Sequence, residues 1–413
     1  MPNGQRVDKS LSETTTDGEA RGGRARLSEL VGRAKAMVPE IGARAAQAEA
    51  ARRICDETIA DFAAAGLFRI LQPARYGGYE LDYGTAQLEL AAEIGQACGS
   101  SAWILTVIAC HAWILGMYPL EAQEEIWGDS SETLLASALY PEHCEMERVA
   151  GGYRLAGQWK FASGVVHAQW VILGATMAQP DGKMLPLWCI VPRRDYEIID
   201  TWFVSGLRAT GSNDVRVAGS TVPEHRVLPA SLLLEGSAPG AKVNPSHIFR
   251  LPLSGVFPYN LSAPAVGIAR GGWQAFVQRV RDQPKRLAAS RSADMDTVQL
   301  QVAEAATLID CAYLLQARDA EELNTRARAG LAMGHEHRAR YLRDLAYAAQ
   351  LCLRAVDMIH YLSGAHGLFD DNPLQRAFRD LHALNAHTAL QWRNMGLSFG
   401  RLSLGLPVGG PWS

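Results

Sequence analysis

The amino-acid sequence predicts an α+β protein in three parts, with helices at both ends of the chain and a small β domain between them. Apolar residues recur at three- and four-residue steps up to about Leu134 and again beyond Pro252, which is typical of amphipathic helices. From Leu135 the pattern changes to short apolar runs separated by Gly, Pro and Asn, which is typical of antiparallel strands. The expected parts are a disordered leader (1–25), an N-terminal helical domain (26–134), a β-barrel domain (135–235) and a C-terminal helical bundle (236–413).

Within these parts the sequence indicates individual elements. The N-terminal domain is expected to hold an amphipathic helix at 85–97 and a buried helix at 102–117. Strands of an antiparallel barrel or sandwich are expected at the apolar runs 135–140, 152–161, 170–177, 187–191, 196–199 and 214–217. After a linker rich in Pro, Gly and Ser, long helices are expected at 300–317, 341–361 and 374–400.

Composition and charge exclude several classes of partner. Hydrophobic residues make up 48% of the chain and charged residues 20%, which is ordinary for a globular protein. A net charge of -3 gives no electrostatic basis for binding nucleic acid or an anionic membrane. The seven cysteines are scattered, without the spacing of a metal site, which is typical of the reducing cytoplasm. We therefore expect a cytoplasmic protein without a bound metal.

One segment, 94–120, is long enough to span a bilayer and contains no Asp, Glu, Lys or Arg. It does contain polar residues, including His111, and its flanking residues Glu93 and Glu121 are acidic where a membrane helix usually has basic neighbours. We therefore expect a helix buried among other helices. The first residues of the chain lack the apolar core of a signal peptide.

The stretch 152–164 reads as a strand that ends in Ser163 and Gly164. Its alternation places Trp159 and Phe161 on one face, where they would form a flat aromatic wall next to a hydroxyl group. Such a wall suits a planar ring such as a flavin. An ordinary hairpin with an aromatic core and a Ser-Gly turn is the alternative, and these residues taken alone fit it better.

Five segments in order resemble one family of enzymes. They are 71–79, 101–103 with 111–113, 159–164, 206–212 with 222–226, and 372–381 with His387. Across about 27–406 the chain resembles the acyl-CoA dehydrogenase fold. Within that fold it is most similar to the oxygenase components of two-component flavin-dependent monooxygenases, such as the 4-hydroxyphenylacetate 3-hydroxylase oxygenase.

The resemblance implies a reaction and a set of partners. It implies that reduced FMN or FAD arrives from a separate NAD(P)H:flavin reductase and reacts with dioxygen to form a C4a-hydroperoxide. That species would hydroxylate a small phenolic or polycyclic aromatic substrate. The resemblance also implies a homotetramer assembled as a dimer of dimers.

Departures from the dehydrogenase pattern favour the oxygenases over the dehydrogenases of this fold. No Glu follows Arg379-Asp380, where many dehydrogenases carry the base that takes a proton from a thioester. The element that holds the adenine half of FAD in dehydrogenases is eroded at 285–289, which favours a diffusible flavin. Four alternatives stay open: an acyl-CoA dehydrogenase or oxidase, N-oxygenation or S-oxygenation on the same fold, and a helical scaffold that has lost its flavin.

The resemblance assigns roles to individual residues. The catalytic candidates are His387 beside the reactive oxygen, Ser163 beside flavin N5, and His111 on the substrate side. The further substrate-binding candidates are Ser137, Trp113 and Arg250. The further cofactor-binding candidates are Trp159, Phe161, Arg286 for a phosphate, and Gln299. The structural alternatives are a turn-capping Ser163, a helix-face His387, a satisfied core His111 and a solvated Arg286.

Overall fold

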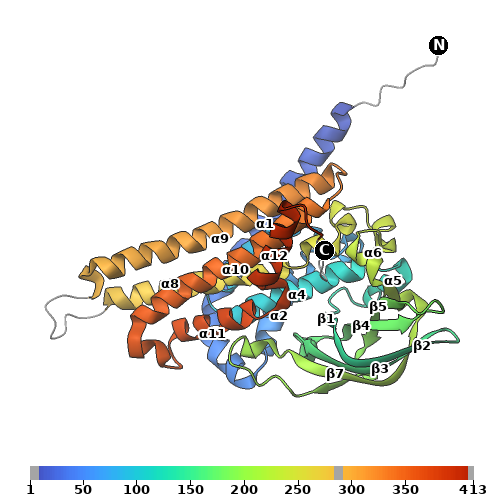
Figure 1. The fold of residues 1–413 in the computed structure, drawn as a ribbon, viewed down its shortest axis with the longest axis horizontal. Coiled ribbons are helices and arrows are strands. Elements are labelled where there is room, and N and C mark those ends of the chain that lie inside the picture. Colours follow the sequence, from blue (N-terminus) through green and yellow to red (C-terminus); the bar gives the residue numbers. More distant parts are fainter. Residues whose placement is uncertain (1–8, 283–291, 408–413) are drawn as a thin grey trace, which may run out of the picture.

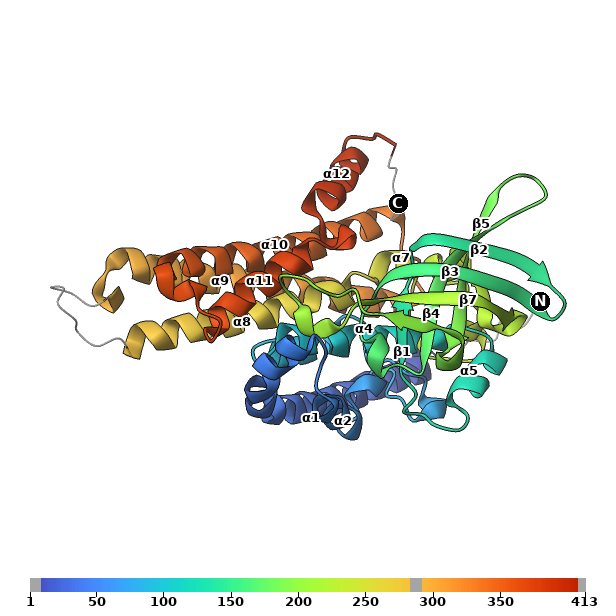
Figure 2. The same ribbon diagram turned by 90° about the horizontal axis from the view of Figure 1, so that it is seen from below.

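The computed structural model describes residues 9–282 and 292–407, and these residues adopt the acyl-CoA dehydrogenase-like fold that the sequence predicts. Long C-terminal helices run side by side, and the β domain lies at one end of them (Figure 1). From the second direction, the first helices of the chain and the last ones lie on opposite sides of the molecule (Figure 2).

The N-terminal domain consists of five helices. They are α1 Lys9–Ala51, α2 Asp56–Ala64, α3 Thr85–Ile94, α4 Gly99–Gly116 and α5 Leu120–Trp127. A disordered leader was expected at 1–25; in the structure α1 begins at Lys9, and residues 1–8 lie outside the described residues. The beginning of α1 projects past the rest of the molecule (Figure 1), and the first buried side chain described along it is Leu30. The beginning of α1 is rich in Gly, Ser, Thr and charged residues and carries no apolar stripe that would indicate a helix from sequence.

Helix α4 lies at the centre of the molecule. Every one of its residues is buried, between α3, α8 and the β domain. Together with α9 (Asp296–Arg328), α4 is one of two helices among the described residues that are long and apolar enough to cross a membrane. Its complete burial inside the protein identifies it as a core helix, as the sequence predicts.

The β domain contains two sheets of four strands each. Its strands are β1 Leu135–Ala138, β2 Pro141–Val149, β3 Gly152–Ala162, β4 Trp170–Ala178, β5 Met184–Pro192, β6 Glu197–Ile199, β7 Asn213–Pro223 and β8 Val227–Pro229. The strand orders are β1-β4-β5-β8 and β2-β3-β7-β6, and all pairs are antiparallel except β1 with β4. Sequence periodicity missed β2, because most of its side chains are polar and largely exposed.

The C-terminal part follows two short helices, α6 (Ala230–Leu234) and α7 (Leu253–Val256). Its long helices are α8 Tyr259–Asp282, α9 Asp296–Arg328, α10 His335–Ser363, α11 Pro373–Asn385 and α12 Trp392–Ser403. The single helix expected at 374–400 was wrong, because the chain breaks between α11 and α12. There the Nδ1 atom of His387 accepts a hydrogen bond from the backbone N–H of Ala389 at 3.2 Å. Such local side-chain bonds compete with helical hydrogen bonds, and no Gly or Pro marks this break in the sequence.

The loop between β6 and β7, residues 200–212, is fixed at two points. The guanidinium group of Arg52, which follows α1, donates two hydrogen bonds of 2.6 and 2.7 Å to the carboxylate of Asp200 at the start of the loop. In the middle of the loop, the carboxylate of Asp380 on α11 accepts the backbone N–H of Leu207 at 2.7 Å. The β6–β7 loop therefore connects the N-terminal and C-terminal helices across the β domain.

Replacing Gly206 with Ala is expected to destabilise the protein by about 1–3 kcal/mol, because the buried loop has no room for a side chain there. A Cβ atom at this position would lie 2.0 Å from the carbonyl oxygen of Arg379, which is backbone and cannot turn away. Urea unfolding followed by circular dichroism measures the difference. Gly400→Ala is the control, since no atom lies within 4 Å of its added Cβ atom. Equal stabilities for the two variants would show that the loop does not pack tightly against α11.

Candidate active site

One face of α4 borders the β domain along its length. Ile104, Ile108 and His111 share this face, because residues three and four apart lie above one another on a helix. A Cβ atom added to Gly164 would lie 3.2 Å from Ile104 and 3.5 Å from Ile108, so the turn after β3 rests directly on α4. The same helix face therefore reaches both Ser163, next to Gly164, and the first strand of the β domain.

Ser163 is held from two sides. Its hydroxyl oxygen accepts a hydrogen bond from the indole N–H of Trp103 on α4 at 3.2 Å. It also lies 2.8 Å from the hydroxyl oxygen of Ser212 in the β6–β7 loop. The next backbone N–H, that of Gly164, donates to the carbonyl oxygen of Thr210 at 2.9 Å. The hydroxyl of the half-buried Ser163 is thus fixed in place.

His387 also lies beside Trp103. The centroids of the Trp103 and His387 rings are 6.1 Å apart, with an angle of 54° between the ring planes. Burial lowers the pKa of His387 to about 4, so the imidazole is neutral at pH 7. Because its Nδ1 atom accepts from Ala389, the ring proton lies on Nε2, which can act as a hydrogen-bond donor.

His111 forms a second polar group with Ser137 on β1. The Nδ1 atom of His111 lies 2.8 Å from the carbonyl oxygen of Leu135, and its Nε2 atom lies 2.8 Å from the hydroxyl oxygen of Ser137. A carbonyl can only accept, so Nδ1 carries the proton and Nε2 accepts from the Ser137 hydroxyl. Burial lowers the pKa of His111 to about 4. This neutral imidazole is therefore a hydrogen-bond acceptor for the serine.

The two polar groups are separated along α4. From Trp103 to His111 the helix rises by about 12 Å, at roughly 1.5 Å per residue. One group thus lies near the start of the buried helix and the other near its end, with the apolar side chains of Ile104 and Ile108 on the face between them. The face between the two groups is covered, because Ile104 and Ile108 are 0% and 1% exposed and the turn after β3 rests on them.

Phe161 and Trp159 have different environments, although alternation predicts a shared face. Trp159 is fully buried in the β domain, where its indole N–H donates to the carbonyl oxygen of Gly174 at 2.6 Å. Phe161 is 66% exposed and has a φ of 68°, a strained conformation for a bulky residue. The pairing of β3 with β7 shifts between Trp159 and Ala162, and this irregularity turns Phe161 outward. The exposed Phe161 ring lies 6.1 Å from the Trp202 ring of the β6–β7 loop, and its contact with a flavin stays a prediction.

The remaining predicted site residues are not brought to either group by any described contact. Trp113 is fully buried, and its indole N–H donates to a backbone carbonyl at 2.9 Å, which suits a packing role in the core. The exposed Arg250 donates to a carbonyl of its own loop at 2.9 Å. The exposed Gln299 donates to the carbonyl of Ala293 at 2.9 Å, near the start of α9. Arg286 lies outside the described residues.

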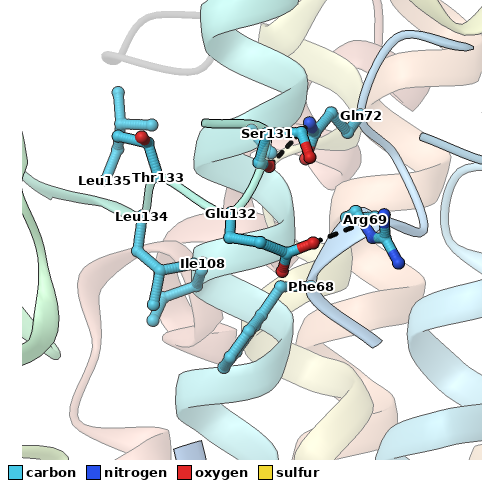
Figure 3. Close-up of a pocket in the computed structure, with 10 residues that line it drawn as sticks. Phe68, Arg69, Gln72, Ile108, Ser131, Glu132, Thr133, Leu134 and Leu135 are labelled. Atoms are coloured by element: carbon cyan, nitrogen blue, oxygen red, sulfur yellow. Dashed lines mark hydrogen bonds and ion pairs between the residues drawn. The ribbon is translucent and has the colours of Figure 1, made fainter. Parts of the chain in front are cut away.

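Figure 3 shows a small pocket between α4, the 3₁₀ segment after α2 and the residues that precede β1. An ion pair of 3.3 Å joins Arg69 to Glu132 across it, and the amide of Gln72 donates to the carbonyl of Ser131 at 3.0 Å. Its volume of about 10 Å³ is near the minimum for one water molecule. An aromatic substrate does not fit there.

Sequence reasoning missed three residues that organise the site: Trp103, Thr210 and Ser212. All three lie in segments that resemble the family, but none received a role of its own. A tryptophan on an apolar helix usually belongs to the core, and Thr and Ser near a glycine usually belong to a turn. No sequence pattern indicated that their side chains would meet Ser163.

Two family models match this chain. The Acyl-CoA dehydrogenase, N-terminal domain model matches residues 32–129, and the Acyl-CoA dehydrogenase, C-terminal domain model matches residues 259–392. The oxygenase subunit HsaA of a flavin-dependent monooxygenase from Rhodococcus jostii is 34% identical over 381 residues, which cover 91% of this chain and 98% of that protein. The chain belongs to the oxygenase components of flavin-dependent monooxygenases.

Two further comparisons agree with this assignment. The oxygenase component of the FADH(2)-dependent resorcinol hydroxylase from Rhizobium sp. is 34% identical over 93% of this chain and 96% of its own length. The structure of XiaF from Streptomyces sp. in complex with FADH2 and glycerol has a TM-score of 0.88 at 27% identity, over 95% of this chain and 98% of that one.

This oxygenase component hydroxylates aromatic substrates, and its reduced flavin comes from a separate reductase. The predicted reaction class and cofactor are thereby confirmed. The acyl-CoA dehydrogenase alternative lacks a base in the expected place. Asp380, which follows Arg379, is buried and accepts the backbone N–H of Leu207 at 2.7 Å, so it serves the fold.

Acid pH is expected to destabilise the protein through His111. Its pKa of about 4 in the folded state lies below its usual value of 6.5, so the unfolded chain binds its proton first as the pH falls. The stability that this group contributes is complete above pH 6.5 and is lost as the pH falls towards 4, with about 2 kcal/mol lost at pH 5. Urea unfolding at pH 7.5 and pH 5.0 measures the loss.

The variant His111→Gln should show a smaller loss between these two pH values, although it is less stable at pH 7.5. His382→Gln, at an exposed histidine on α11, is the control and should behave like the parent protein. An unchanged loss in His111→Gln would contradict the assignment of the pH dependence to this residue.

Proposed function

We propose that this oxygenase component hydroxylates a phenolic ring that binds at one of its two polar groups, with the flavin at the other. The reduced flavin lies against Phe161, Ser163 and Trp103, and the substrate hydroxyl lies at Ser137 and His111. The observation that carries the proposal is that both groups, each with a neutral imidazole, lie along one buried helix. When bound, reduced flavin activates dioxygen and supplies an electrophilic oxygen atom.

His111 and Ser137 take up the proton of the substrate hydroxyl. A phenol becomes much more acidic while an electrophile attacks its ring, and its proton then needs an acceptor. The Ser137 oxygen can accept that proton while its own proton passes to Nε2 of His111, 2.8 Å away. The imidazole is neutral above about pH 4, so Nε2 is unprotonated across the physiological range; because the same pKa makes the ring a weak base, it takes the proton only once attack on the ring has made the phenol acidic.

His387 is the proposed hydrogen-bond donor at the reacting oxygen. With flavin and dioxygen bound, its Nε2–H group would donate to an oxygen atom next to the flavin. The buried apolar face of α4 excludes water from this region, which strengthens such hydrogen bonds and prevents wasteful release of hydrogen peroxide.

We propose reduced FAD as the flavin. Support comes from the names of two relatives, one FADH(2)-dependent and one solved with FADH2. The phosphate role of Arg286 and the role of Gln299 remain proposals, as does contact of Arg250 with an acidic group of the substrate.

The function is tested by a product screen of phenols and bicyclic aromatics with a generic flavin reductase, NADH and FAD, including amines and thiophenes as competing substrate classes. We expect a catechol or another hydroxylated product from a phenol. Product only from the amines or thiophenes would overturn the proposal.

Within that assay, Ser163→Ala is expected to reduce the product formed per NADH by about fivefold, the value of one hydrogen bond of about 1 kcal/mol. His387→Ala should slow product formation by about a hundredfold, the scale of general acid catalysis. Released hydrogen peroxide is measured in parallel and should rise in both variants. Ser398→Ala, at a half-buried serine that donates to the backbone of its own helix α12, is the control. If the product formed per NADH were unchanged in Ser163→Ala and His387→Ala, the hydrogen-bonding role of Ser163 and the proton-donor role of His387 would both be contradicted.

We propose that the chain assembles as a homotetramer in the cytoplasm. Large apolar side chains are exposed on the C-terminal helices, including Leu300 (70%) and Leu314 (63%) on α9 and Leu397 (60%) on α12. Sedimentation should give about four times the mass of one chain, and Leu314→Asp should lower it. A monomeric parent protein would contradict this assembly.

A further inference from the structure

Ser163 is the last member of a chain of side-chain hydrogen bonds that begins in the β6–β7 loop. The Thr210 hydroxyl donates to the carbonyl oxygen of Leu207 at 2.9 Å. The hydroxyl oxygens of Thr210 and Ser212 lie 2.7 Å apart, and those of Ser212 and Ser163 lie 2.8 Å apart. The indole N–H of Trp103 reaches Ser163 from the other side at 3.2 Å. We call the three hydroxyl groups of Thr210, Ser212 and Ser163 the hydroxyl relay.

The direction of each bond follows from counting protons. The carbonyl oxygen of Leu207 only accepts, and it also accepts the backbone N–H of Thr210 at 3.1 Å; we assign the single hydroxyl proton of Thr210 to this carbonyl. Ser212 must then donate to Thr210, and Ser163 must donate to Ser212. The indole of Trp103 can only donate. Ser163 therefore has no free proton, and one lone pair remains for a ligand.

Burial protects this direction from exchange with water. Thr210 and Ser212 are only 2% and 3% exposed, whereas Ser163 is half buried. The accepting end is also fixed, because the backbone N–H of Leu207 is held by Asp380. The Leu207 carbonyl further accepts the indole N–H of Trp202 at 3.2 Å. Because the two inner hydroxyl groups are buried and the final acceptor is fixed, every hydrogen bond of the relay keeps the same donor-to-acceptor direction.

We propose that the hydroxyl relay makes Ser163 an obligate hydrogen-bond acceptor and thereby selects reduced over oxidised flavin. Atom N5 of a reduced flavin carries a hydrogen and donates, whereas N5 of an oxidised flavin carries only a lone pair. The accepting Ser163 oxygen forms a hydrogen bond with N5–H of the reduced flavin and repels the N5 lone pair of the oxidised flavin. This inference rests on the proposed placement of flavin N5 beside Ser163. Thr210 and Ser212 are then positioning residues that determine which redox form binds.

The test measures dissociation constants of FAD in both redox forms, the reduced form anaerobically, by equilibrium dialysis. The parent protein should bind reduced FAD more tightly. Ser212→Ala removes the acceptor for the Ser163 proton and frees that proton for oxidised N5. We expect the preference for reduced FAD to fall about fivefold to tenfold, corresponding to about one hydrogen bond.

Two further variants keep the test independent of folding defects at Ser212. Thr210→Val removes the hydroxyl that accepts from Ser212 and should also lower the preference for reduced FAD. Thr210→Ser restores the hydroxyl and should restore the preference. Ser220→Ala, at a serine near the other end of β7 that donates to Asp195, is the matched control.

The outcomes separate the relay from the placement of the flavin. If Ser163→Ala changes the dissociation constant of neither redox form, the proposed flavin position is wrong. If Ser163→Ala weakens binding of reduced FAD while Ser212→Ala and Thr210→Val leave the preference unchanged, the flavin position stands and the relay is wrong. A lower preference in Thr210→Val that Thr210→Ser does not restore also overturns the relay.

Discussion

The hydrogen bond from the Trp103 indole to the Ser163 hydroxyl is the contact on which the site depends. It joins the buried α4 to the turn after β3, and the same indole lies beside the His387 ring from the C-terminal domain. One side chain thus sets the relative position of groups from all three parts of the chain. An indole is well suited to this role, because it is large and rigid and its N–H can only donate.

Burial determines the chemistry of both imidazoles. His111 and His387 lie in different parts of the chain, yet each has a pKa of about 4 because desolvation disfavours the charged ring. A neutral ring has one donor and one acceptor, and the neighbouring backbone decides which nitrogen is which. Leu135 leaves His111 an accepting Nε2 atom, whereas Ala389 leaves His387 a donating one. Equal pKa values therefore accompany opposite roles.

The sequence predicts the order of domains well, because a change from helical to alternating periodicity needs no knowledge of tertiary contacts. It predicts the site less well. Ser163 and His387 were named through family resemblance, and the break that orients His387 depends on a hydrogen bond to its own backbone, without Gly or Pro. The outward turn of Phe161 depends on a shift in strand pairing with β7. Contacts between distant segments, such as Trp103 with Ser163, leave no local pattern to read.

The β6–β7 loop connects domain packing to the chemistry of Ser163. Its anchors are Asp200 against α1 and Leu207 against Asp380 of α11, and the hydroxyl relay begins at the same Leu207. Burial raises the pKa of Asp380 to about 6, so the charged carboxylate present at neutral pH carries a desolvation cost that its bond to the Leu207 N–H partly offsets. Any movement of α11 that breaks this bond would also move the carbonyl that fixes the relay. The accepting character of Ser163 therefore depends on all three parts of the chain being packed together.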